Sequence, residues 1–218
     1  MKVLFIGNSY TYYNEMPQLF EKLCRDNGKD VKVYSVTKGG RKLINYQDPE
    51  DPITQKIDQL LEGQRYDFCF IQEQSVLPAA DPDLFFEGAR FVVNKVKNHV
   101  SQFIMYATWG RKSGSETLAK HNWTTEEMNA QLLFSYRKVA ESVGAKVSPV
   151  GSSFLKVTLS NPEINLHNPD FSHPSYHGSC LAALTHYYTL FEEFPCVTTS
   201  FDLSANEIFA FKNAVCAN

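Results

Sequence analysis

VLFIGNSY, residues 3–10, is the segment of this chain that says most about its architecture. Its first four residues are all apolar, and an apolar run without alternation is typical of a short strand buried on both faces of a parallel sheet. Gly7 then allows a tight turn, and Asn8 and Ser9 are residue types that begin turns and helices. The segment therefore predicts a strand that leads directly into a β–α turn.

Similar apolar runs recur along the chain and alternate with segments of helical period. Further strands are predicted over 31–36, 66–71, 103–108 and, as a short piece, 146–150. Helices are predicted over 17–27, 53–61, 85–100, 126–143 and from 174 onward. A last helix is predicted from Ser204, which forms a capping box with Glu207. This alternation predicts an α/β fold, a three-layer α/β/α sandwich with a five-stranded parallel sheet.

Length and composition indicate one domain with neither a nucleic acid nor a membrane as partner. The 218 residues are 43% hydrophobic and carry 21 Lys and Arg against 24 Asp and Glu, a formal net charge of −3. A domain of this size buries roughly 70% of its unfolded surface, which is enough for a core of its own. Lys and Arg never cluster beyond two adjacent residues, and no apolar stretch approaches the ~20 residues of a membrane span. Composition does not predict the oligomeric state.

The first residues and the cysteines predict a cytoplasmic protein. One basic residue and a run of four apolar residues precede Gly7, too few for the apolar region of a secretory signal. The five cysteines are widely spaced and include no C-x-x-C pair for zinc or redox chemistry: Cys24, Cys69, Cys180, Cys196 and Cys216. We expect all of them to be structural or incidental.

Ser9 is the first candidate for chemistry, because it follows the first predicted strand. The carboxyl ends of parallel strands form the edge where ligands bind in open α/β sheets. A hydroxyl at that edge is well placed to act as a nucleophile, and the Ser9 backbone N–H can point into the same crevice. The alternative is that Asn8 and Ser9 only form a turn and a helix cap.

Asp170 and His173 form the second candidate pair, in a polar loop before the last long helix. A serine hydroxyl needs a base to take its proton, and a carboxylate can hold a histidine base in the right tautomer. Three positions apart, the two side chains can face one crevice, with His173 as base and Asp170 orienting its second ring nitrogen. The alternative is that Asp170 caps a turn and His173 is structural.

The order and the sequence context of Ser9, Asp170 and His173 resemble the SGNH (GDSL-like) hydrolase family. The family's first block, G-D-S, is matched by Gly7-Asn8-Ser9 with asparagine in place of aspartate, and its last block, D-x-x-H, is matched in full. Gly-Asn-Ser-Tyr-Thr, Ile-Gln-Glu-Gln-Ser and His-Pro-Ser look like a bacterial subgroup of this family. The resemblance extends from residue 1 to about residue 191.

This resemblance implies both an architecture and an activity. It implies a single SGNH-like hydrolase domain with a flavodoxin-like parallel sheet, followed by a C-terminal extension from about residue 196. It also implies a serine esterase that needs neither a cofactor nor a metal. In such an enzyme Ser9 is the nucleophile, His173 the base and Asp170 its partner.

The resemblance also implies an oxyanion hole, although this chain matches the family's oxyanion-hole residues less closely than its first and last blocks. The family uses the serine N–H, a glycine N–H after the second strand and an asparagine side chain after the third. Here Ser9 supplies the first donor, and the pair Gly39-Gly40 supplies the second, with Gly39 favoured. The third block, G-x-N-D, is absent, and Gln72-Glu73-Gln74-Ser75 takes its place. Either Gln72 or Gln74 could replace the asparagine, with Gln74 favoured, unless both pair with loop backbone.

Aromatic residues near the predicted crevice point to the substrate. Tyr10 and Trp109 follow two of the predicted strands, and aromatic rims suit sugars or flat acyl groups. We expect a small-molecule or carbohydrate ester as substrate, with a small acyl group, above all acetyl. Three cations could contact a negatively charged leaving group. Arg111 and Lys112 lie in the irregular loop predicted over 109–125, and Arg41 follows the pair Gly39-Gly40.

Two further functions stay open at this point. The departures from the family at Asn8 and over 72–75 could mean an inert SGNH-like binding module. Asp170, His173 and His177 could instead hold a catalytic metal. Pro174 suits the first position of a helix, however, which would place His173 outside the helix that carries His177. The other histidines are expected on the surface or on helix faces: His99, His121, His167 and His186.

Overall fold

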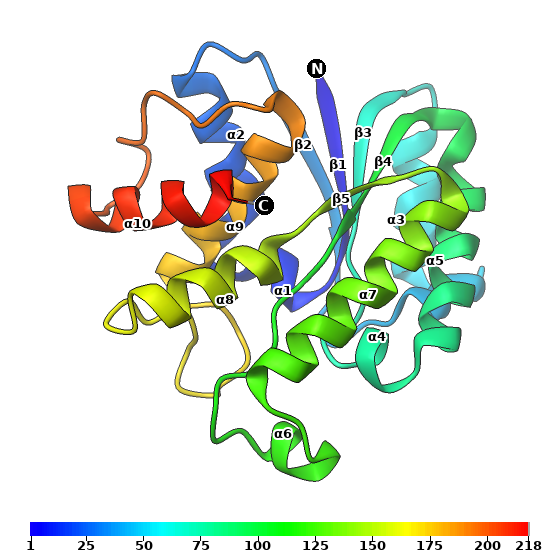
Figure 1. Cartoon of the computed structure of the whole chain (residues 1–218). Helices are drawn as coiled ribbons and strands as arrows, with labels where there is room; N and C mark the ends of the chain where they lie inside the picture. The colour runs from blue at the N-terminus through cyan, green and yellow to red at the C-terminus, as the bar shows by residue number, and fades with distance from the viewer. Residues whose placement is uncertain (218) are drawn as a thin grey trace.

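Five parallel strands in the order β2-β1-β3-β4-β5 form the central layer of the computed structural model, which describes residues 1–217 (Figure 1). All four strand pairs are parallel. The strands are β1 (Lys2–Gly7), β2 (Lys32–Thr37), β3 (Tyr66–Ile71), β4 (Val100–Tyr106) and β5 (Lys146–Ser148). The predicted α/β/α sandwich with a five-stranded parallel sheet is confirmed.

Helices cover both faces of the sheet (Figure 1). One layer is made of α2 (Met16–Asp26), α8 (Val150–Ser160), α9 (Tyr176–Phe191) and α10 (Ala205–Cys216). The other is made of α3 (Pro52–Leu61), α5 (Pro82–Val96) and α7 (Thr125–Val143). Short pieces lie at strand ends and in loops: α1 (Ser9–Tyr12), η1 (Tyr13–Glu15), η2 (Leu43–Gln47), α4 (Leu77–Ala80), η3 (Lys97–His99) and α6 (Glu116–His121).

The interior strand β1, between β2 and β3, divides its side chains between two hydrophobic cores. Val3 and Phe5 belong to the cluster on the side of α2 and α9, whereas Leu4 and Ile6 belong to the cluster on the side of α3 and α5. All four are fully buried. Burial on both faces explains why the run shows no polar alternation. It also fixes the end of β1, and with it Ser9, at the carboxyl edge of the sheet.

The last helix begins as predicted, with Ser204 as N-cap and a capping box to Glu207. Phe211 and Val215 of α10 are fully buried in the same hydrophobic cluster as α9. Within residues 1–217, no helix is both long and apolar enough to cross a membrane.

Several predicted boundaries are wrong. The strand predicted over 103–108 is β4, which spans Val100–Tyr106. The helix predicted over 85–100 starts at Pro82, after the N-cap Asp81, and ends at Val96. Val100 is spaced four residues from Val96 and so extends the apolar period, but it opens β4. The strand predicted over 146–150 ends at Ser148, because Val150 begins α8.

Other predictions are wrong where a short polar residue sets the start of a helix, or where a polar side chain is buried. The loop predicted over 109–125 contains α6, which is capped by Ser115. The closing helix starts at Tyr176 with Ser175 as N-cap, so Pro174 precedes the helix and does not occupy its first position. His167 is buried and lies outside the helices, so it is neither on the surface nor on a helix face, whereas His186 lies on the buried face of α9. Burial among aromatic rings lowers the pKa of His186 to about 3.

Candidate active site

Ser9 lies at the point where β1 passes into α1, at the carboxyl edge of the sheet. Asn8 caps this helix: its Oδ1 accepts a hydrogen bond from the Tyr10 N–H at 3.1 Å. Ser9 is therefore the first helical residue, and the first N–H groups of a helix have no acceptor within the helix. The backbone N–H of Ser9 is thus free to serve a ligand beside its own hydroxyl.

Gly7 is required by close packing beneath Ser9. A side-chain carbon at this position would lie 2.5 Å from Oγ1 of Thr11 and 2.6 Å from Oε1 of Gln72. Both distances are well inside van der Waals contact, so any larger residue would push the turn out of place. The glycine of the first family block therefore has a steric role in this chain.

The structure brings Ser9, His173 and Asp170 together. Nε2 of His173 lies 2.9 Å from Oγ of Ser9, and Nδ1 of His173 lies 2.5 Å from Oδ2 of Asp170. Oδ1 of Asp170 also accepts the backbone N–H groups of Ser172 and His173, at 3.0 and 2.9 Å. Partial burial raises the pKa of Asp170, but these hydrogen bonds outweigh it and hold that pKa below its usual value. Asp170 is therefore a carboxylate at neutral pH.

Aromatic rings fix the imidazole of His173 in this position. Tyr13 stacks on it with 4.3 Å between ring centroids, and Tyr10 meets it edge-on at 5.5 Å. Tyr10 in turn stacks on Trp109 at 4.6 Å, and Trp109 stacks on Phe154 at 4.2 Å. The chain of rings reaches from the core to the imidazole and leaves it little freedom to rotate.

Two of these rings also hold the loop that carries the histidine. The hydroxyl of Tyr10 lies 2.9 Å from Oγ of Ser172, and Nε1 of Trp109 donates to the Ser172 carbonyl oxygen at 3.1 Å. Trp109 is only 1% exposed, so it does not form the substrate rim that the sequence predicts. It is a packing residue behind the site, whereas Tyr10 does line the cavity at Ser9.

A small cavity of about 160 Å³ lies over Ser9 and His173. Ligand pockets for drug-sized molecules are usually about 300–1,000 Å³, so only a small group fits here. The residues that line it come from four strand ends and from the loop before α9: Asn8, Ser9, Tyr10, Gly40, Gln74, Ser75, Arg111, Ser172 and His173.

Of the two glycines after β2, Gly40 lines this cavity and Gly39 does not. Gly39 faces Tyr12, since a side-chain carbon there would lie 3.1 Å from the Tyr12 hydroxyl. Neither glycine N–H has an acceptor in the described part of the chain. Nδ2 of Asn8 donates to the carbonyl oxygen of Arg41 at 3.0 Å and so ties this loop to the start of α1. That bond needs an amide donor, which the aspartate of the family block does not have.

The two candidate glutamines have different surroundings. Gln72 is buried below Ser9, where its Oε1 accepts the Asn8 N–H and the Thr11 hydroxyl, both at 2.9 Å. Gln74 lines the cavity. Its Oε1 accepts the N–H groups of Val76 and Leu77, at 3.0 and 3.1 Å. Its Nε2 donates one of its two hydrogens to Oγ of Ser75 at 3.4 Å. The expected pairing with loop backbone is therefore found, but Gln74 keeps a donor at the site.

Glu73 is a functional candidate that the sequence analysis missed. Its side chain is fully buried and accepts the N–H of Leu43 at 3.0 Å and that of Gln74 at 2.5 Å. Burial raises the pKa of Glu73 to about 7, although these hydrogen bonds and the charge of Lys42 oppose the rise. A glutamate directly after the apolar run of β3 is the sequence signal that could have revealed it. The carboxyl group connects the loops after β2 and β3, which carry Gly40 and Gln74.

Among the three loop cations named from the sequence, only Arg111 lines the cavity. Its Nη2 donates to Oγ of Ser75 at 2.8 Å, and its guanidinium carbon lies 5.6 Å from the Tyr10 ring. Arg41 is buried and paired with Asp51 at 2.9 Å. Lys112 donates to Asn165 at 2.9 Å, outside this cavity.

A metal centre on Asp170, His173 and His177 has no converged ligand set. Nε2 of His177 lies 2.8 Å from Oε1 of Glu207, on the side of α10. No three His, Cys, Asp or Glu side chains among residues 1–217 are arranged to hold a metal ion.

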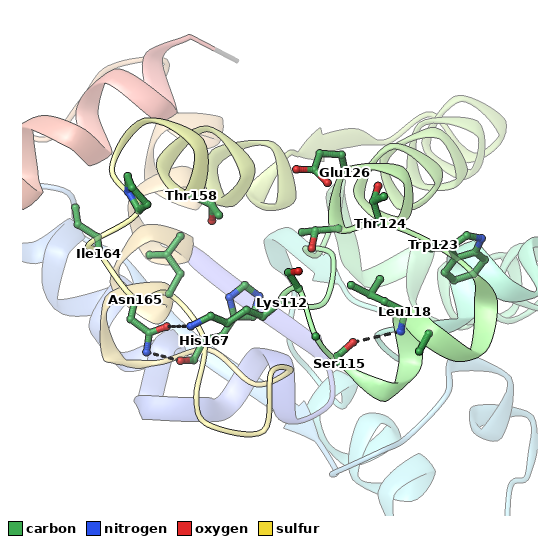
Figure 2. Close-up of a pocket in the computed structure, with 16 residues that line it drawn as sticks. Lys112, Ser115, Leu118, Trp123, Thr124, Glu126, Thr158, Ile164, Asn165 and His167 are labelled. Carbon is green, nitrogen blue, oxygen red and sulfur yellow. Dashed lines mark hydrogen bonds between the residues drawn. The ribbon is translucent and has the colours of Figure 1, made fainter.

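A larger cavity, of about 670 Å³, lies elsewhere (Figure 2). Figure 2 shows it between Thr158, Ile164 and Asn165 on one side and Trp123, Thr124 and Glu126 on the other, with Lys112 and His167 between them. It shares no lining residue with the cavity at Ser9. Cavity size alone would therefore have pointed away from the candidate site.

Comparison with solved structures finds the same fold in several proteins. A protein from Slackia heliotrinireducens proposed to be an SGNH hydrolase is 26% identical, with a TM-score of 0.77 over 87% of this chain and 98% of that one. A DUF4886 family protein from Bacteroides uniformis is 18% identical, with a TM-score of 0.82 over 100% and 93%. An acetylxylan esterase from Geobacillus stearothermophilus is 16% identical, with a TM-score of 0.65 over 88% and 94%. No family model and no curated protein matches the chain.

Proposed function

We propose that this chain, which is similar in fold to SGNH-type hydrolases and esterases, is a serine esterase acting through Ser9, His173 and Asp170. Its substrates are acetyl or similarly small acyl esters of a carbohydrate or related metabolite.

The observation that supports this most strongly is the pair of short contacts along the three side chains. Oγ of Ser9, both ring nitrogens of His173 and Oδ2 of Asp170 form one continuous hydrogen-bonded line of 2.9 and 2.5 Å. A serine hydroxyl becomes a nucleophile when a base in contact takes its proton, and the base is held by a third group. An inert binding module has no need for this alignment.

The reaction follows from the order of these contacts. Oγ of Ser9 attacks the ester carbonyl carbon while its proton passes to Nε2 of His173, and Asp170 stabilises the imidazolium. The tetrahedral intermediate then collapses, the bond to the alcohol oxygen breaks, and that oxygen takes the proton from Nε2. A water molecule next attacks the acyl-enzyme, gives its proton to His173 and releases the carboxylic acid and free Ser9.

We infer three donors for the developing oxyanion. The N–H groups of Ser9 and Gly40 and the Nε2 amide of Gln74 all belong to residues that line the same cavity. We assign the second donor to Gly40 and not to Gly39, because Gly40 is the glycine in the cavity. Such fixed donors stabilise negative charge that appears only in the transition state.

The size of the cavity supports the proposal that the acyl group is acetyl. A volume of about 160 Å³ admits an acetyl group beside the donors and favours a small acyl group. An acetylxylan esterase among the structural neighbours is similar in fold and acts on an acetylated carbohydrate. Acetyl esters of sugars are therefore the first substrates to assay.

The test is hydrolysis of p-nitrophenyl acetate by the wild type and by Ser9→Ala and His173→Ala. We expect turnover by the wild type and a loss of kcat on the order of 10⁴-fold or more in each variant, with unchanged melting temperatures. Full activity in either variant would show that these residues are not the nucleophile and the base.

A further inference from the structure

A second cavity adjoins the one at Ser9 and has no part in the chemistry described so far. It has a volume of about 440 Å³ and is lined by Arg111, Gly114, Ser115, Glu116, Thr117, Asp170 and Phe171. Arg111 lines both cavities. Asp170 and Phe171 belong to the same turn as Ser172 and His173, which face the acyl cavity. A group attached to an ester bound at Ser9 can therefore reach this second cavity directly.

Phe171 has a backbone conformation that is uncommon for a bulky residue. Its backbone is left-handed, with φ of 58°, although it is neither glycine nor asparagine. Bulky residues adopt this region rarely and at a cost, and such strain concentrates at ligand sites. The residue is also 40% exposed, so it is in part open to a ligand. The strained turn is held by bonds from the Phe171 N–H to Asn168 and from the Lys112 N–H to the Phe171 carbonyl oxygen, both 3.0 Å.

The polar groups around the ring suit a sugar. In Arg111, Nη2 donates to Ser75 and Nε is buried, so Nη1, which has no hydrogen-bond partner among the described residues, is the guanidinium donor left for a ligand. Glu116 adds a carboxylate, and Thr117 adds a hydroxyl. An aromatic face with donors and acceptors around it matches the apolar C–H face and the hydroxyl rim of a pyranose. The mixed charges of the cavity favour a neutral sugar over a strongly anionic one.

We propose that this cavity binds the sugar ring of the alcohol part of the substrate, with Phe171 as the surface on which the ring lies. The inference rests on the proposed esterase function and adds where the carbohydrate is recognised. His173 must hand its proton to the departing alcohol, and Phe171 lies two residues before it in the same turn. The sugar and the proton donor are thus positioned by one loop.

The other cavities fit this role less well. Trp123, the aromatic residue of the larger cavity, stacks on His121 at 4.3 Å and packs against the cluster of Leu118, Met128 and Leu132, so its ring is already occupied. A third cavity shares Gly40 with the acyl site but is lined without any aromatic side chain.

The experiment compares two esters in matched variants. Ethyl acetate fills only the acyl cavity, whereas mono-acetylated xylobiose also carries a neutral sugar. We expect Phe171→Asn, whose side chain tolerates the left-handed backbone, to lower the ratio of kcat/KM for acetylated xylobiose to that for ethyl acetate by about threefold to tenfold. Phe171→Tyr keeps the ring and should keep the ratio. Phe134→Asn, at a phenylalanine 64% exposed on α7, is the matched control.

The possible results separate the two claims. An unchanged ratio in Phe171→Asn, or an equal loss in Phe171→Tyr, overturns the sugar subsite and leaves the esterase intact. If Phe171→Asn does not fold, free xylobiose should still inhibit ethyl acetate hydrolysis by the wild type competitively, and an absence of inhibition also overturns it. A wild type that hydrolyses neither ester contradicts the proposed function itself.

Discussion

Nε2 of His173 lies 2.9 Å from Oγ of Ser9, although the two residues are 164 positions apart in the chain. Ser9 is held by the end of β1, and His173 is held by a stack of aromatic rings that reaches into the core. The contact therefore depends on two rigid supports that meet at the carboxyl edge of the sheet. Residues that hold this contact in place can therefore be tested by substitution without changing Ser9 or His173.

Tyr13→Leu is expected to lower kcat/KM for p-nitrophenyl acetate by about threefold to tenfold, because stacking of aromatic rings contributes about 0.5–1.5 kcal/mol and His173 loses that contact. Tyr13→Phe keeps the stacked ring and serves as the control. Equal activities in the leucine and phenylalanine variants would mean that the ring does not position the imidazole.

Gln74→Glu tests the third oxyanion donor and keeps the hydrogen bonds that the side chain accepts from the loop backbone. The carboxylate keeps an oxygen for the N–H groups of Val76 and Leu77, but it removes the Nε2 donor and adds negative charge at the cavity. Loss of one such donor typically costs about 10²–10³ in kcat, and we expect at least that with an unchanged melting temperature. A variant with wild-type kcat would remove Gln74 from the oxyanion hole.

Asn8→Asp restores the residue of the family block and is nevertheless expected to reduce activity. The aspartate still accepts the Tyr10 N–H, but it cannot donate to the Arg41 carbonyl oxygen and places two acceptors against each other. A lost hydrogen bond of this kind costs about 1–3 kcal/mol, and the displaced loop carries Gly40. We expect kcat for p-nitrophenyl acetate to fall about tenfold. Wild-type kcat would show that this bond does not hold Gly40 in place.

Glu73 predicts a measurable pH dependence of stability. Its pKa rises from an ordinary value of 4.5 to about 7 in the folded protein, so the unfolded chain releases this proton at lower pH than the folded one. The free energy of unfolding should therefore fall between pH 4.5 and 7, by about 3 kcal/mol from this group, and stay level above that range. Urea titrations across this range should show a smaller fall for Glu73→Gln than for the wild type. Identical pH profiles would contradict the buried, protonated state.

The sequence was sufficient for the architecture and for the meeting of Ser9, Asp170 and His173. Continuous apolar runs separated by helical periods define a parallel sheet, and strand ends in such a sheet converge at one edge. The order of the blocks then indicated which polar residues lie there. These signals are local in the chain or concern the ends of strands. They can therefore be read from the sequence without knowledge of side-chain packing.

Side-chain packing decided what the sequence left open or predicted wrongly. Trp109 looks like a rim residue in the chain, but its ring lies between Tyr10 and Phe154 inside the core. Gly39 and Gly40 are adjacent, and only the turn after β2 determines which of them faces Ser9. Helix α8 was not predicted: the strand predicted over 146–150 includes Val150, the first residue of this helix, and no element was predicted over 151–160.

The most direct test of the account is the labelling of the protein with a fluorophosphonate, followed by mass spectrometry of the modified peptide. We expect one adduct, on Ser9 of the wild type, because only an activated hydroxyl displaces the fluoride. This adduct should be lost in His173→Ala. An unlabelled wild type, or an adduct on another residue, would contradict the proposal that Ser9 is the nucleophile of a working triad.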